Sequence, residues 1–309
     1  MQTDVYKRVL AALTLSAASL TQALEVKFEA VAPHVYAYVG DTEGRTYQNE
    51  ALNANIGLVV TPAGAVLIDP GASFQSARQI AEAAKRVTPL PIKWVINTGG
   101  QDHRWMGNGY FKAQGAEIMA HRAGEADMKA RGPEHLKANA PVLKEKLDGT
   151  DVVLPTRWLN EPNTTLDFGG TTLEVVHRQG GHTPGDSLVW LPQSGVVFTG
   201  DVVYVDRILG LHPVSKTKTW VQSFEALEAL NPKVVVPGHG RVTTLAQAQK
   251  DTGHLLKALR AHMGQAVEAG TDMGTAIKTF DAAPYKHLKH VDVWLPQLAN
   301  RTYLEMEQE

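Results

Sequence analysis

The chain contains no cysteine in its 309 residues. This absence excludes a disulfide scaffold, an iron–sulfur cluster, a thiolate zinc site and a cysteine nucleophile. Any metal must therefore be held by histidine, aspartate, glutamate or amide oxygens. The twelve histidines make such a site feasible.

The chain also has no excess of charge of one sign. Thirty Lys and Arg residues face thirty-two Asp and Glu residues, which gives a net charge of -2 and no basic footprint for nucleic acid. Hydrophobic residues make up 43% and charged residues 20%, which indicates a folded core rather than disorder. We expect a small-molecule substrate and no nucleic-acid partner, and the composition leaves the oligomeric state open.

Long apolar runs are also missing beyond the N-terminus, so no membrane span is expected. Residues 1–23 are typical of a secretory signal: a basic pair precedes the apolar run Val9–Leu20, and Thr21 and Ala23 are the small residues of a cleavage site. An ordinary N-terminal helix is the alternative, and Asp4 in the basic flank weakens the signal interpretation. The expected mature chain begins after Ala23 and is periplasmic or secreted.

Strand-like and helix-like segments alternate after residue 25, which predicts a single α/β domain over residues 24–309. The expected strands and hairpins are Asn55–Asp69, Ile92–Asn97, Glu117–His121, Thr164–His177, Ser187–Thr199 and Lys233–Val236. The expected helices are Ser73–Arg86 with Ser73 as N-cap, a stretch over 122–148 broken at Gly132-Pro133, and Thr244–Glu268.

Polar residues follow these apolar strands directly, which is a common place for a functional site. The glycines among them allow the backbone to turn sharply and approach a ligand closely. The segments are Asp69-Pro70-Gly71, Asn97–Asn108, Gly180–Asp186, Thr199-Gly200-Asp201 and Pro237-Gly238-His239-Gly240.

This ordered set resembles the metallo-β-lactamase-fold hydrolases over most of residues 25–309. The matching pieces are Asp69-Pro70-Gly71, Asp102-His103, His182 in HTPGD, Asp201 in TGD and His239 in PGHG. The resemblance implies a four-layer αββα sandwich whose strand-end loops supply metal ligands. The chain also resembles the exported SoxH-type and glyoxalase II-like branch, through its Arg207 segment and Arg301–Glu307.

One loop departs from the family pattern, Thr-His-x-His-x-Asp-His-x-x-Gly-Asn. Without a gap, Gly99 and Gln101 replace the paired histidines, and His103 and Arg104 take the Asp-His positions. With a one-residue shift, Asp102 and His103 take the Asp-His role instead. We favour the shift, because Arg offers no lone pair to a metal and the adjacent glycines ease the change.

The resemblance implies two metal sites, of which the first has lost its histidine pair. It keeps His182 and Asp201, with Gln101 as a further candidate. The second would be complete with Asp102, His103, Asp201 and His239, and Asp102 also serves as the catalytic residue. Four N and O ligands suit Zn²⁺ and allow Fe or Mn. We expect about one tightly held ion per chain, against the family's usual two.

Each candidate residue also has a structural interpretation. His182 could hydrogen-bond a turn, Asp201 could cap one, and Asp102 could cap the following helix. Possible substrate-contacting or supporting residues are Gln101, Arg104, Trp105, His177, Tyr204 and Arg207. The other histidines, including His121, His135 and His212, are expected at the surface or in packing.

The favoured function is a metal-dependent hydrolase of an ester, thioester, amide or lactam, in which a metal-bound water attacks the carbonyl. A catalytically weak or non-catalytic binding protein is the alternative, because of Gly99 and Gln101. An iron oxygenase of the persulfide-oxidising type is disfavoured by the lost first-site histidine. The shifted register predicts that Asp102→Ala and His103→Ala lose metal, whereas Arg104→Ala keeps it.

Overall fold

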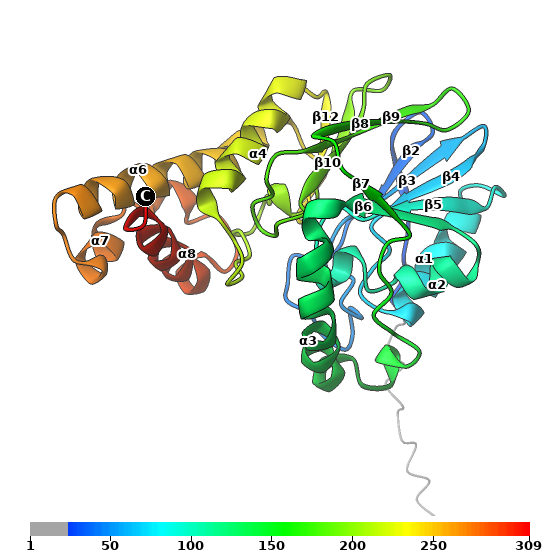
Figure 1. Cartoon of the computed structure of the whole chain (residues 1–309), viewed down its shortest axis with the longest axis horizontal. Helices are drawn as coiled ribbons and strands as arrows, with labels where there is room; N and C mark the ends of the chain where they lie inside the picture. Colours follow the sequence, from blue (N-terminus) through cyan, green and yellow to red (C-terminus); the bar gives the residue numbers. More distant parts are fainter. Residues whose placement is uncertain (1–23) are drawn as a thin grey trace, which may run out of the picture.

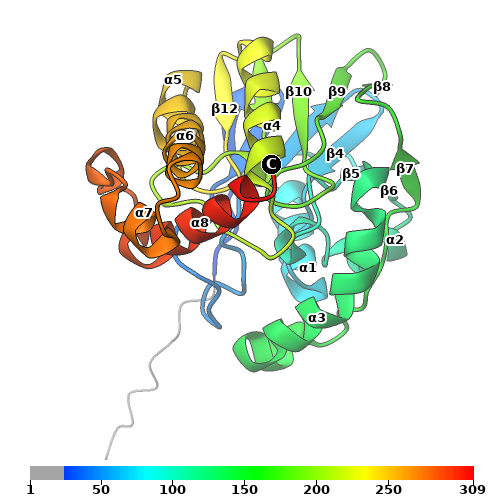
Figure 2. The ribbon, with the colours of Figure 1, turned by 60° about the vertical axis from the view of Figure 1, so that its left-hand side comes forward.

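Two β-sheets pack face to face and carry helices on their outer faces, as the computed structural model shows (Figures 1 and 2). The structure describes residues 24–309, and the predicted signal lies outside them. The seven strands of the first sheet follow chain order: β1 (Glu29–Ala32), β2 (Val35–Tyr38), β3 (Ile56–Thr61), β4 (Gly64–Ile68), β5 (Ile92–Ile96), β6 (Glu117–His121) and β7 (Arg157–Leu159).

The second sheet has five strands in the order β12-β11-β10-β9-β8. They are β8 (Asn163–Asp167), β9 (Thr172–His177), β10 (Ser187–Leu191), β11 (Val196–Phe198) and β12 (Val234–Val236). The helices are α1 (Phe74–Lys85), α2 (Asn108–Ala113), α3 (Glu125–Leu143), α4 (Thr217–Leu230), α5 (Leu245–Ala248), α6 (His254–Glu268), α7 (Met273–Thr279) and α8 (Val291–Met306).

Three apolar layers hold this arrangement together. Inward-facing residues of both sheets, such as Val66 and Val189, form the layer between them. Helix α1 buries Ile80 against the outer face of the first sheet. Helices α4, α6 and α8 cover the outer face of the second sheet, with Trp220 and Leu256 in that layer. The predicted four-layer αββα sandwich is confirmed.

Most predicted elements are confirmed, and Ser73 caps α1 with a reciprocal capping box to Ser76. The predicted break at Gly132-Pro133 is wrong, because α3 continues through it. Gly132 instead allows close packing: a Cβ there would lie 2.7 Å from Cγ1 of Val152. No helix of the described residues has the length and apolarity needed to cross a membrane.

The strand-end loops gather where the two sheets meet at one edge of the sandwich. β4 and β5 pair in parallel, as do β11 and β12, so the segments that follow these strands leave at the same end of their sheet. The short 3₁₀ helix η1 (Asp102–Arg104) follows β5, and η4 (Gly200–Val202) follows β11. The candidate ligands therefore come from both sheets.

Candidate metal centre

Three histidine side chains converge on the Asp201 carboxylate. The Nε2 atom of His103 lies 3.1 Å from Oδ2, and the Nε2 atom of His239 lies 3.2 Å from Oδ1. His182 Nε2 lies 3.8 Å from Oδ2. All four residues are buried. His103, Asp201 and His239 each offer a ligand atom within 4.8 Å of the other two, which is the arrangement of a metal site.

Backbone contacts fix the orientation of His239. Its Nδ1 lies 2.7 Å from the carbonyl oxygen of Asn53, so Nδ1 carries the proton and donates it. Burial lowers the pKa of His239 to about 3, so the ring is neutral at neutral pH and Nε2 presents a lone pair. That lone pair faces the ionised Asp201 carboxylate. Two hydrogen-bond acceptors this close repel each other, and a cation between them would remove the repulsion.

His182 gives independent support for a cation. Its Nε2 is buried and has no hydrogen-bond partner among the described residues. Buried polar atoms are normally satisfied, and a cation bound at Asp201 would satisfy this one. Burial also holds the pKa of His182 well below its ordinary value and lowers that of His103. Three neutral imidazoles and one carboxylate are a donor set that suits Zn²⁺, so these residues fit a divalent metal.

Arg104 is buried against the Asp201 and Asp69 carboxylates and does not face the cavity described below. Its Nη2 donates to Oδ1 of Asp201 at 2.7 Å, and its Nη1 donates to Oδ2 of Asp69 at 2.9 Å. Nη2 also donates to the carbonyl oxygen of Gly238 at 3.0 Å, where a side chain has no room: a Cβ would lie 2.6 Å from that nitrogen. Burial would raise the pKa of Asp201, but the Arg104 charge and His103 outweigh burial and hold it well below the usual range.

The Asp102 carboxylate lies outside this group of ligand atoms. It accepts hydrogen bonds from Gln101 Nε2 at 2.9 Å, from Asn139 Nδ2 at 2.8 Å and from Arg45 Nη2. Its Oδ1 lies 3.4 Å from Nδ1 of His103. This position suits a residue that orients His103, because ligating histidines commonly donate their second N–H to a carboxylate or carbonyl.

The structure leaves no room for a histidine side chain at Gly99. A Cβ at Gly99 would lie 2.5 Å from Oδ1 of Asp186 and 3.2 Å from Oγ1 of Thr183. Asp186 is buried and bound to Thr183, and burial raises the pKa of Asp186 to about 7. The space beside residue 99 thus belongs to the Thr183–Asp186 turn. Gln101 is buried and bonds Asp102.

A cavity of about 770 Å³ adjoins the centre. Arg45, Gln101, Asp102 and His212 line it, together with Arg131 and Asn139 of α3. Its size is that of a small-molecule site.

His212 lies close to the ligand cluster, since its ring centroid is 4.8 Å from that of His182. Burial lowers the pKa of His212 to about 4, and the Arg131 and Arg45 charges add to this. Sequence reasoning placed His212 at the surface or in packing and did not single out Arg45, Asn139 or Arg131, because nothing local marks residues that meet only in the fold.

The remaining predicted residues are buried around the ligand cluster. Trp105 is fully buried and donates to the carbonyl oxygen of Gly100 at 3.0 Å. His177 stacks on His121 with centroids 3.7 Å apart and binds the carbonyl oxygen of Asp186. The Tyr204 ring stacks on His239 at 4.7 Å. Arg207 is buried close to Tyr204, at 5.9 Å from its ring centroid.

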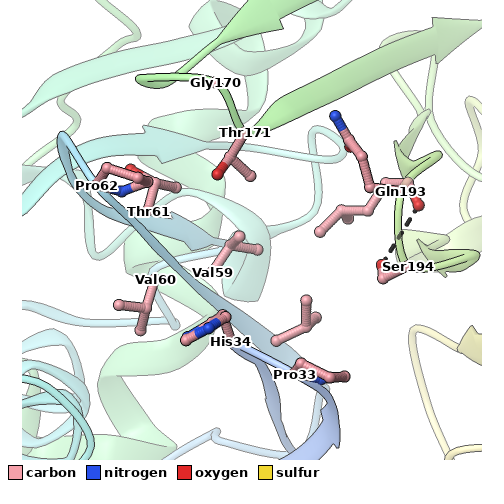
Figure 3. Close-up of a pocket in the computed structure, with 12 residues that line it drawn as sticks. Pro33, His34, Val59, Val60, Thr61, Pro62, Gly170, Thr171, Gln193 and Ser194 are labelled. Carbon is pink, nitrogen blue, oxygen red and sulfur yellow. Dashed lines mark hydrogen bonds between the residues drawn. The ribbon is translucent and has the colours of Figure 1, made fainter.

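A second cavity of about 530 Å³ lies elsewhere on the sandwich (Figure 3). Val59 and Val60 of β3 form one wall, and Thr171 and Gln193, from the turns of the second sheet, lie across from them. His34 is its one titratable lining residue and the cavity holds no carboxylate. The titratable groups next to the ligand cluster instead line the larger cavity, through Asp102 and His212.

Comparison with known proteins agrees with this site. The family model described as the metallo-beta-lactamase superfamily matches residues 49–239. The hydroxyacylglutathione hydrolase GloC of Haemophilus influenzae is 28% identical over 195 residues, covering 62% of this chain and 87% of the relative. A type 2 metallo-beta-lactamase of Bacillus sp. strain 170 is 29% identical over 206 residues, covering 65% of this chain and 72% of that protein.

Solved structures show the same fold. The sec-alkylsulfatase Pisa1 from Pseudomonas sp. aligns with a TM-score of 0.69 at 17% identity, covering 90% of this chain and 50% of that one. A metallo-beta-lactamase from Pontibacter korlensis aligns with a TM-score of 0.60 at 23% identity, covering 75% of this chain and 99% of that one. Fold and site define a metal-dependent hydrolase. The chain belongs to the metallo-beta-lactamase superfamily, and it is a metallo-hydrolase of that superfamily.

Proposed function

We propose that the enzyme hydrolyses an acyl bond (ester, thioester, amide or lactam) at a centre holding one tight divalent ion, with Zn²⁺ as the best match. The observation that carries this proposal is the convergence of His103, His182 and His239 on Asp201, with a neutral, oriented His239 and an unpartnered His182 Nε2. Fe and Mn are the alternatives that the same donors allow.

The protein residues divide the work around that ion. His103, His182, His239 and Asp201 would hold it, and when bound it supplies a Lewis acid that makes water a usable nucleophile near neutral pH. Asp201, kept ionised by Arg104, neutralises part of its charge. The 770 Å³ cavity beside His212 would hold the substrate. In the proposed site, Asp102 orients His103 instead of binding the ion.

The single ion follows from the first loop. Gly99 and Gln101 supply no imidazole, and the Thr183–Asp186 turn fills the space beside Gly99. The same feature favours the second candidate function, a weakly catalytic or non-catalytic binding protein. We also propose export after Ala23 and membership of the SoxH-type and glyoxalase II-like branch, which N-terminal sequencing and substrate profiling respectively would test.

Metal content and hydrolysis, measured together, test the main proposal. The purified chain should retain about one equivalent of Zn²⁺ after dialysis and hydrolyse at least one of a panel of esters, thioesters and lactams. His239→Ala should lose both properties, whereas the exposed His254→Ala of α6 should lose neither. Retained metal without hydrolysis of any substrate would favour the binding protein, and two retained equivalents would contradict the single-ion centre.

A further inference from the structure

The 530 Å³ cavity lies at the end of the sandwich opposite to the metal centre. Strand β3 starts beside the centre, where the backbone N–H of Asn55 donates to the carbonyl oxygen of Gly238, and it ends at Thr61 in the cavity lining. Its six residues span about 20 Å in extended conformation. The cavity is therefore separate from the candidate substrate cavity, and the two could be occupied at the same time.

Three aliphatic lining residues of this cavity belong to the core between the two sheets. Val35 of β2 and Val59 of β3 are paired across the first sheet, and Leu191 ends β10 in the second sheet. All three are buried members of the inter-sheet apolar layer. The cavity is thus an opening into that layer, and an apolar group that enters it would extend the packing of the core.

Four hairpin turns contribute the rest of the lining. His34 comes from the turn between β1 and β2, and Pro62 comes from the turn between β3 and β4. Thr171 precedes β9 in the turn after β8, and Gln193 lies in the turn between β10 and β11. Figure 3 shows these side chains around an open space. Both sheets therefore contribute to the site, as they do at the metal centre.

The polar groups of the lining are few, and almost all are neutral. No Lys, Arg, Asp or Glu residue lines the cavity. The Ser194 hydroxyl donates to the carbonyl oxygen of Leu191 at 3.3 Å, and the Thr61 hydroxyl donates to that of Gly64 at 2.6 Å. The Thr171 hydroxyl, in contrast, makes no hydrogen bond to another residue of the described chain (Figure 3). It is therefore free to bind a ligand.

We propose that this cavity is a second binding site, for a neutral small molecule with a slender apolar part and one hydroxyl or carbonyl group. Packed sheets lie about 10 Å apart, so the apolar part must be as thin as an alkyl chain or a single aromatic ring. The cavity volume falls within the range of about 300–1,000 Å³ that is usual for small-molecule sites. The Thr171 hydroxyl would bind the polar group. A charged ligand would lose hydration without gaining a counter-ion.

Methyl NMR of the full chain, with 1-octanol as the probe, tests this site directly. The methyl signals of Val35, Val59 and Leu191 should shift in a saturable way, and to the same extent with and without bound metal. The octylammonium ion is the charged comparison and should bind at least about tenfold more weakly, because its charge finds no partner there. The proposal fails if these methyl signals do not respond, or if the two probes bind equally well.

Two substitutions of the half-buried Thr171 locate the ligand. Thr171→Trp should fill the cavity and abolish 1-octanol binding, whereas Thr165→Trp on the exposed side of β8 should keep it. Thr171→Val preserves the shape of the side chain and removes the hydroxyl. It should weaken 1-octanol binding about threefold to tenfold, the scale of one neutral hydrogen bond. Normal binding by Thr171→Trp would place the ligand elsewhere, and normal binding by Thr171→Val would contradict the role of the hydroxyl.

A second copy of the chain is the competing occupant, because an apolar opening can also be covered by association. Sedimentation over a range of protein concentrations separates the two cases. The oligomeric state should be the same for wild type and Thr171→Trp, and 1-octanol should not change it. Self-association that is lost in Thr171→Trp would make the cavity an interface between copies and overturn the proposal. Metal content and hydrolysis test the proposed function separately, since neither depends on this cavity.

Discussion

Arg104 and Asp201 form a buried ion pair at the base of the metal centre, with Nη2 2.7 Å from Oδ1 and Nε 3.3 Å from Oδ2. The same guanidinium reaches Asp69 after β4, so one cation links loops of both sheets. Burial opposes the charge of Arg104, but Asp201 and Asp69 outweigh burial and raise its pKa above the ordinary value.

Removing this guanidinium should destabilise the whole protein. Arg104→Ala leaves Asp69 and Asp201 buried without their partner, and breaking such a pair costs about 3–5 kcal/mol. Denaturant unfolding measures this, with Arg157→Ala expected within about 0.5 kcal/mol of wild type. Metal content should also fall, which revises the expectation from sequence. A stable Arg104→Ala with full metal content would show that the pair does not organise the centre.

Removing the charge of Asp102 and removing that of Asp201 should affect metal binding differently. Asp102→Asn removes the charge that orients His103 and holds Arg45, and loss of such a supporting group lowers metal affinity about 10–100-fold with the stoichiometry unchanged. Asp201→Asn should abolish tight binding. Competition with a chelator measures both affinities. Equal, complete loss of metal in the two variants would make Asp102 a direct ligand.

Restoring the family's first histidine should fail. A side chain at Gly99 collides with Oδ1 of Asp186, so Gly99→His should destabilise the chain by about 1–3 kcal/mol, as overpacking does. Elemental analysis should show no added metal. The exposed Gly44, whose added Cβ would meet nothing within 4 Å, gives Gly44→Ala as a control for tolerance of added side chains. A second tightly held ion in Gly99→His would contradict the packing argument.

His121 predicts a component of acid sensitivity. Burial, and then the neighbouring His177, lowers its pKa from the ordinary 6.5 to about 4. The unfolded chain therefore takes up a proton first as pH falls. The stability linked to neutral His121 is complete above about pH 6.5 and is lost progressively towards pH 4. The free energies of unfolding of wild type and His121→Phe should change in parallel with pH above about pH 6.5, and the wild type should lose more stability than the variant below it. Parallel curves at every pH would refute the assignment.

The strand-end motifs could be predicted because each is local. His182, Asp201 and His239 each sit in a short polar motif directly after an apolar strand, and the structure places all three together. The alternation of elements similarly predicted the layers. Among the helices and strands, the prediction failed for residues 122–148. Gly132 allows close packing against Val152 and does not break the helix.

The role of the Gly99–Arg104 loop could not be settled from sequence. Whether Asp102 or Arg104 faces Asp201 depends on a 3₁₀ turn and on Asn139, which approaches from α3. Arg45 and Asn139, which both bind the Asp102 carboxylate, lie 57 and 37 positions from it in the chain. They come from the loop after β2 and from α3, and no spacing rule relates them.

The contacts of that loop also bear on when the enzyme becomes competent during its synthesis. The Asn55 amide binds the carbonyl oxygens of Pro237 and Gly240, and the Asn53 carbonyl orients His239, across separations of 182, 185 and 186 residues. A ribosome releases the N-terminal member of each pair long before the other. Asn53 and Asn55 can therefore make these contacts only after more than half of the polypeptide has been synthesised. Such distant pairings form slowly. Uptake of the proposed metal ion is therefore expected late, and its rate would report on completion of the fold.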